Sequence, residues 1–154
     1  MTQLIGETPR RYSAPGRGHA KKIIYLACPY THPDGRIREE RFRSATEVAA
    51  DLIRQGHIVY SPITMTHPID VVLAGTGSTL GSDFWVSFDE AFMDACSEMV
   101  ILKVDGWDKS AGIKREIAYF KKQGKPIRYV LPKKNVVIGQ ASRFGRRRNR
   151  ERLS

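Results

Sequence analysis

The sequence predicts one α/β domain, a parallel sheet of four to five strands with helices on both faces. Apolar runs that suit strands alternate along the chain with longer segments in which apolar residues recur at helical spacing. The first run, within residues 22–28, is apolar at successive positions, as is typical of a strand buried on both faces of a sheet. Glycines and prolines separate the segments. This order favours a Rossmann-like (flavodoxin-like) sheet.

The first βαβ unit is predicted from residues 22–60. The strand at 22–28 ends before Pro29, and Pro33, Asp34 and Gly35 have the chemistry of a turn. A helix is expected over 36–55, because its apolar residues have helical spacing and Gly56 follows it. Residues 57–60 form a second short strand, which Pro62 terminates.

No element is predicted between Pro62 and Ser82. Residues 75–82 consist almost entirely of Gly, Ser and Thr, which cannot build a core, and they are expected to form a mobile loop. This segment lacks the Gly-Lys-Ser/Thr ending of a phosphate-binding P-loop.

The remaining elements complete the alternation. A helix carries four residues with apolar side chains on one face: Trp85, Phe88, Phe92 and Ala95. A third strand at 99–104 and a loop at 105–110 follow. A helix is then expected from Ala111 to Gln123, ended by Gly124, and a fourth strand at 125–131.

The net charge of +10 lies in the two ends of the chain. Residues 1–22 carry +4 and residues 133–154 carry +7, whereas the stretch between them sums to −1. We therefore predict a flexible basic arm (1–21), a catalytic domain (22–132) and a basic disordered tail (133–154). The ends are either solvated only or weakly attractive to a polyanion such as nucleic acid.

Several function classes are disfavoured by composition. The sequence has no apolar run long enough to cross a membrane and no signal-peptide h-region, so we expect a cytoplasmic protein without membrane association. Cys28 and Cys96 lie in apolar runs and are expected to be buried free thiols. The histidines lack metal-ligand spacing, so neither a metal nor an organic cofactor is expected.

Glu116 is the first candidate for chemistry. It falls on the flank of the stripe formed by Ile113, Ile117 and Phe120, where a carboxylate is partly removed from water. It also follows a strand's carboxyl end, where ligands of parallel sheets bind. Either Glu116 is a boundary residue paired with a nearby base, or it is an ionised nucleophile.

Asp89 is the second candidate, because it borders the apolar face of the preceding helix. One carboxyl group that attacks an anomeric carbon and a second that assists the leaving group are the minimum equipment for glycosidic cleavage. A solvated surface aspartate is the alternative, and Glu90 and Asp94 compete for the role.

Ser110 and Gly112 open the last helix. Ser110 suits an N-cap, and its hydroxyl together with the free amides of the first turn suits a phosphate equally well. Gly112 permits a close approach of the backbone to a ligand. Pro29 and Tyr30, directly after the first strand, are expected to contact the same ligand.

The ordered set of motifs resembles the nucleoside 2-deoxyribosyltransferase superfamily. The similarity covers roughly residues 22–131 and is carried by the segments 24–30, 52–56, 59–62, 105–118 and 124–126. The resemblance implies that Glu116 forms a covalent 2-deoxyribosyl intermediate, that Asp89 assists the departing base and that Tyr25 lines the sugar pocket. Without the resemblance, Tyr25 is a core aromatic.

Within that superfamily, Ser110 is similar to the serine of the 2′-deoxynucleoside 5′-monophosphate N-hydrolases, whereas transferases acting on free nucleosides tend to carry Asp there. The resemblance therefore implies a nucleotide substrate, water as acceptor and a homodimer or higher homo-oligomer. Base exchange between nucleosides and a non-catalytic nucleotide-binding module with nucleic-acid-docking tails remain the alternatives.

Overall fold

The structure, a computed structural model, describes residues 21–77 and 80–133. Its sheet contains four parallel strands in the order β2-β1-β3-β4. The strands are β1 (Ile23–Ala27), β2 (Ile58–Tyr60), β3 (Glu98–Leu102) and β4 (Ile127–Val130). The predicted Rossmann-like α/β fold is thus confirmed. The expected basic arm and tail fall almost wholly outside the described residues.

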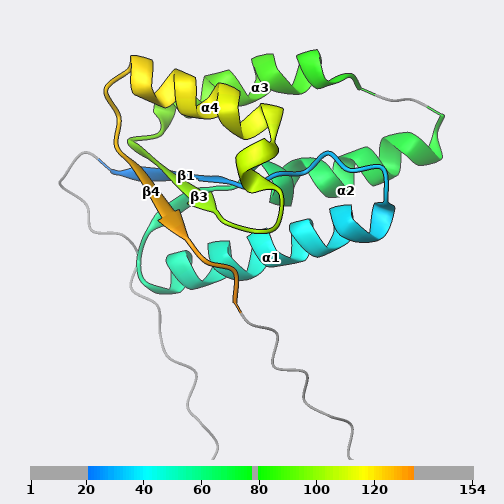
Figure 1. The fold of residues 1–154 in the computed structure, drawn as a ribbon, viewed down its shortest axis with the longest axis horizontal. Coiled ribbons are helices and arrows are strands. Elements are labelled where there is room, and N and C mark those ends of the chain that lie inside the picture. Colours follow the sequence, from blue (N-terminus) through cyan, green and yellow to red (C-terminus); the bar gives the residue numbers. More distant parts are fainter. Residues whose placement is uncertain (1–20, 78–79, 134–154) are drawn as a thin grey trace, which may run out of the picture.

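Helices cover both faces of the sheet (Figure 1). Helix α1 (Gly35–Arg54) lies on one face, while α3 (Ser82–Ala95) and α4 (Ala111–Lys122) lie on the other. Among the described helices, none is long and apolar enough to cross a membrane.

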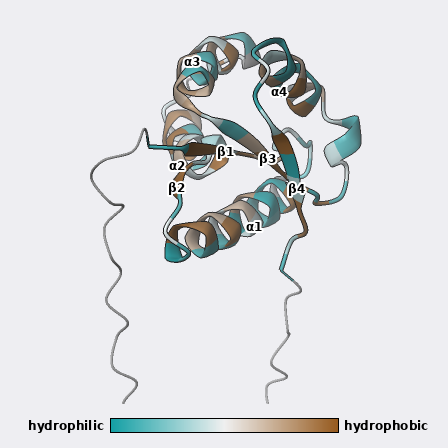
Figure 2. Cartoon of the chain, turned by 90° about the vertical axis from the view of Figure 1, so that its left-hand side faces the viewer, coloured by the Kyte–Doolittle hydropathy of each residue, from teal (hydrophilic) through white to brown (hydrophobic). Residues whose placement is uncertain are grey.

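The side chains of the two central strands, β1 and β3, are divided between two cores. Figure 2 shows that β1 is hydrophobic along most of its length. Ile24 and Leu26 of β1 pack toward α1, whereas Tyr25 and Ala27 pack toward α3 and α4. Because successive side chains of a strand point to opposite faces, a strand buried on both faces must be apolar throughout. This explains the continuous apolar run in β1.

Helix α2 (Pro62–Gly75) was not predicted. Pro62 occupies its first turn, where proline is tolerated, but Pro68 lies inside it and interrupts the usual sequence signal. The helix is also apolar around much of its circumference, and Val71 and Val72 are more than half exposed. Such a helix shows no clear amphipathic period, so the pattern that identified α1 and α4 is missing.

The boundaries of the other elements differ slightly from those predicted. The loop after β3 contains a short 3-10 helix at Trp107–Lys109, and the expected loop at 75–82 begins with the last residue of α2. Residues 78 and 79 of that loop lie outside the described residues. Cys96 is buried, Cys28 is half-buried and both are free thiols.

Candidate active site

A cavity of about 760 Å³ opens at the carboxyl ends of β1, β2 and β3. Its walls come from the segments that follow these three strands, together with α3 and the first turns of α4. The sheet order reverses between β1 and β3, which is where parallel sheets bind their ligands. This cavity therefore lies at the edge of the sheet where the sequence leads us to expect a ligand.

Glu116 lies in the second turn of α4 and lines this cavity. The hydroxyl of Tyr25 donates a hydrogen bond of 2.8 Å to its Oε1. Burial raises the pKa of Glu116 from 4.5 to about 8, against the hydrogen bond from Tyr25, and the nearby charge of Asp89 adds to the rise. Glu116 is a desolvated carboxyl group and not a surface residue paired with a base.

Asp89 of α3 lines the same cavity. Tyr60, the last residue of β2, donates a hydrogen bond of 3.3 Å to its Oδ1. Burial raises the pKa of Asp89 to about 6, and the Tyr60 hydrogen bond opposes the rise. Burial thus raises the pKa of two carboxyl groups that line one cavity, an arrangement that acid–base chemistry uses.

The competitors for the role of Asp89 are placed differently. Asp94 is exposed and accepts hydrogen bonds from Tyr119 and Gln123. Glu90 lines the cavity, but it is exposed. Of the three, only Asp89 combines a position in the cavity with partial burial.

Tyr25 lies behind the cavity and not in its wall. Its side chain is fully buried, and its ring packs against Phe120 and Tyr60 at centroid distances of 5.4 and 5.8 Å. Burial and the neighbouring carboxyl groups raise its pKa well above 10, so the hydroxyl remains a donor to Glu116. Tyr25 therefore positions Glu116 through a hydrogen bond and does not itself line the cavity. The resemblance, by contrast, implies that Tyr25 lines the sugar pocket.

Ser110 and Gly112 lie at the start of α4 and both line the cavity. The Ser110 Oγ accepts a hydrogen bond of 3.3 Å from the backbone N–H of Ile113, so Ser110 is the N-cap. A Cβ on Gly112 would come no closer than 3.7 Å to the Ser110 Oγ. The protein itself thus leaves space at Gly112.

Pro29 and Tyr30 also line the cavity, in the loop that follows β1. Arg41 of α1 fixes this loop, since its guanidinium donates to the carbonyl oxygens of Thr31 and Asp105, each at 3.1 Å. One side chain thereby joins the loops that follow β1 and β3. A Cβ on Gly106 would lie 3.1 Å from this guanidinium, and Gly106 has a left-handed φ of 83°.

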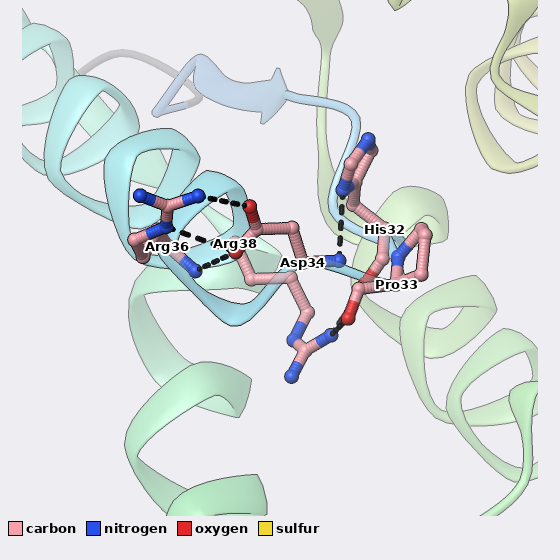
Figure 3. A network of polar contacts seen from close by, with 5 residues as sticks. All are labelled: His32, Pro33, Asp34, Arg36 and Arg38. Atoms are coloured by element: carbon pink, nitrogen blue, oxygen red, sulfur yellow. Dashed lines mark hydrogen bonds and ion pairs between the residues drawn. The ribbon is translucent and has the colours of Figure 1, made fainter.

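The end of the same loop is held by a second set of contacts (Figure 3). Asp34 caps α1 by accepting from the backbone N–H of Arg36 at 2.9 Å, and its own N–H donates to Nδ1 of His32 at 3.0 Å. Arg38 donates to the carbonyl oxygens of His32 and Pro33. The rim of the cavity is therefore tied to the first turns of α1.

Other chemistries find less support in the described part of the chain. Cys28 lines the cavity, but burial raises its pKa to about 12, so it stays a protonated thiol and a poor nucleophile. No group of three His, Cys, Asp or Glu side chains within residues 21–77 and 80–133 is placed to hold a metal ion.

The fold and the site define an α/β domain of Rossmann-like topology with a pair of half-buried carboxyl groups at the carboxyl edge of its sheet. Residues 22–131 match the family described as Domain of unknown function (DUF1937), and the chain belongs to this family. No curated protein matches the chain.

Proposed function

We propose that this protein is an N-glycosidase that cleaves the base–sugar bond of a (deoxy)nucleoside 5′-monophosphate. The observation that carries the proposal is the pair Glu116 and Asp89. Both residues line the same cavity, and each accepts a hydrogen bond from a tyrosine hydroxyl. A cavity of about 760 Å³ is large enough for a mononucleotide.

In the proposed reaction, a carboxylate oxygen of Glu116 attacks C1′ as the bond to the base breaks. The bonding electron pair passes to the base nitrogen, which takes a proton from Asp89. Asp89 then accepts a proton from a water molecule, whose oxygen attacks C1′ and displaces Glu116. The products are the free base and the sugar phosphate, with the configuration at C1′ retained.

The environment of Glu116 suits such a step. A partly desolvated carboxylate interacts more strongly with the positive charge that develops on the sugar than a hydrated one does. The same charge is absent in the ground state, so the interaction favours the transition state. The hydrogen bond from Tyr25 holds the attacking group in position.

Phosphate is assigned to the opening turn of α4. Ser110, Gly112 and the cations Lys109 and Arg115 all line the cavity there. Free backbone N–H groups of a helix's first turn bind anions, and a serine in front of them adds no negative charge. An aspartate at this position would repel the phosphate.

Incubation with a panel of nucleosides and their 5′-monophosphates tests the function. Base released from a monophosphate without any acceptor is the expected result. Exchange that requires an added base would instead support a transferase, and binding without turnover would support the non-catalytic module.

Replacement of Ser110 by Ala is expected to weaken binding of the monophosphate by about 1–3 kcal/mol, because a hydrogen bond to a charged group is lost. Affinity for the matching nucleoside should change much less. The variant also loses its helix cap, at a cost of about 1 kcal/mol in stability. Calorimetric titration of both ligands measures the difference.

Ser110→Asp is the matched control. Aspartate caps a helix as well as serine does, so stability should be retained while the added charge repels the phosphate. If Ser110→Ala weakens both ligands equally and Ser110→Asp weakens neither, Ser110 serves only as a cap.

We further propose a homo-oligomer that uses α2. Ile69, Val71 and Val72 on this helix are exposed by 41, 59 and 67%, and exposed apolar patches mark surfaces of protein–protein contact. Sedimentation equilibrium should therefore give a mass above the 17.4 kDa of one chain. A monomer over the whole concentration range would refute this assembly.

A further inference from the structure

His67 on α2 lies next to the cavity, and its ring contacts three neighbouring side chains. It is 9% exposed, and both ring nitrogens have partners: Nδ1 lies 2.8 Å from the Tyr30 hydroxyl oxygen, and Nε2 lies 2.9 Å from Oε2 of Glu39. The Phe42 ring stacks on the imidazole at a centroid distance of 4.4 Å. Tyr30, His67 and Glu39 thus form a fixed chain from the cavity wall to the surface.

The partners of His67 determine where its proton lies. The Glu39 carboxylate only accepts hydrogen bonds, so Nε2 must carry the hydrogen. In the neutral imidazole Nδ1 is then an acceptor, and the Tyr30 hydroxyl must donate to it. With His67 neutral, the single proton of Tyr30 is used in this way, so the Tyr30 oxygen can only accept a hydrogen bond from a molecule in the cavity.

The Tyr30 hydroxyl oxygen lies across the cavity from Ser110, where the phosphate is proposed to bind. Tyr30 lies in the loop after β1, and its hydroxyl is hydrogen-bonded to His67 of α2, the helix that follows β2. Ser110 follows β3, which lies on the other side of β1 in the sheet. If the phosphate lies at Ser110 and C1′ at Glu116, the base extends toward α2 and α3. Asp70, one turn after His67 on α2, lines the same wall and adds a second acceptor.

We propose that the Tyr30–His67–Glu39 chain sets the hydrogen-bond polarity of the base end of the cavity, so that the protein selects nucleobases with an exocyclic amino group. The inference rests on the proposed function, because it takes the occupant to be a nucleotide. An amino group donates to the Tyr30 oxygen. A carbonyl oxygen at the same place, as in uracil or hypoxanthine, faces an acceptor and leaves it unpaired.

The test is a comparison of binding between paired nucleotides that differ in this one group. The Glu116→Gln protein, which should bind without turnover, is titrated at neutral pH with deoxycytidine and deoxyuridine monophosphates, and with deoxyadenosine and deoxyinosine monophosphates. We expect the amino member of each pair to bind about tenfold more tightly or better. Tyr30→Phe, added to this protein, should lower the ratio, with Asp70 left as the remaining acceptor.

Glu39→Gln provides the sharper variant. Glu39 does not line the cavity, and its side chain is 48% exposed. A glutamine amide can donate to Nε2, which allows the proton to move to Nδ1 and frees the Tyr30 hydroxyl to donate into the cavity. The preference for amino bases should then fall or invert. Glu40→Gln, which removes the same charge from the neighbouring exposed residue, should leave it unchanged.

The outcomes separate this inference from the proposed function. A preference that is absent in the Glu116→Gln protein, or that neither Tyr30→Phe nor Glu39→Gln reduces, overturns the role of the chain. Base release by the wild-type protein without amino preference overturns this inference alone, while failure of all four nucleotides to bind overturns the proposed function with it. If Tyr30→Phe does not fold, the pair Glu39→Gln and Glu40→Gln decides.

Discussion

Glu116→Gln is expected to slow base release by a factor of about 10³ or more and to raise the free energy of unfolding. An amide cannot form the covalent bond to C1′, so the proposed route is closed. The glutamine oxygen can still accept the hydrogen bond from Tyr25. The apolar face formed by Ile113 and Phe120 also remains intact, so the fold should be retained.

The gain in stability follows from the raised pKa of Glu116. The folded protein binds this proton up to about pH 8, whereas the unfolded chain releases it near pH 4.5. The free energy of unfolding therefore falls as the pH rises between these values, because the native state must either keep the proton or bury a charge. Glutamine has no proton to lose, and the variant should be more stable by up to about 3 kcal/mol at pH 7.

Urea unfolding at several pH values measures the effect. The advantage of the variant should be absent near pH 4 and should grow up to about pH 8. Glu40→Gln, which changes an exposed glutamate on α1, should show neither the loss of activity nor the gain in stability. A variant with wild-type turnover would exclude the covalent mechanism.

The fold was predictable where burial leaves a simple pattern. Strands buried on both faces must be apolar at successive positions, and β1 meets this requirement over its whole length. The one-sided burial of α4 likewise left a clear stripe that includes Ile113 and Phe120. Helix α2 lacks such a stripe and contains Pro68, so it was missed.

The site was predictable to a similar extent. Glu116 and Asp89 were identified because a carboxyl group on the flank of an apolar face is visible on a helical wheel. The hydrogen bonds that Tyr25 and Tyr60 donate to them were not predicted, because the bonded residues are 91 and 29 positions apart. The resemblance placed Tyr25 at the site, but as a residue that lines the sugar pocket. Tyr60 ends a predicted strand, and that position was the one available signal.

The sequence pattern did not indicate that Arg41 and His67 help to shape the cavity. Arg41 is one of several basic residues on α1, and its role depends on two carbonyl oxygens from separate loops. His67 lies in the helix that was missed, and Glu39 reaches it from α1. Contacts of this kind depend on how three elements meet in space, which periodicity within one element does not encode.

The pH dependence of kcat/KM is expected to be bell-shaped, with limbs near pH 6 and pH 8. These limbs report the free protein, in which burial raises the pKa of Asp89 to about 6 and that of Glu116 to about 8. The proposed reaction needs Glu116 ionised and Asp89 protonated. Below pH 6 both groups are protonated and above pH 8 both are ionised, so activity should change about tenfold per pH unit on either side.

Between the limbs the productive combination is the minor one, because the group that must be ionised has the higher pKa. It exchanges rapidly with the opposite arrangement, in which Glu116 keeps the proton and Asp89 is ionised. Both arrangements carry one proton, so the profile is flat between the limbs. In the resting protein, Glu116 therefore keeps its proton most of the time. The positive charge that develops on the sugar during the reaction then favours the ionised form of Glu116.

Asp89→Asn separates the two carboxyl groups. Without a proton donor, kcat/KM should fall by about 10²–10⁴. The alkaline limb should disappear, because the remaining requirement is an ionised Glu116, and the single rise should lie below pH 8, since the charge of Asp89 no longer raises the pKa of Glu116. Initial rates of base release across the pH range measure both profiles. If the wild-type rate instead rises through pH 8 and stays level above it, Asp89 acts as an ionised group that orients the base, and the proton for the leaving group comes from another donor.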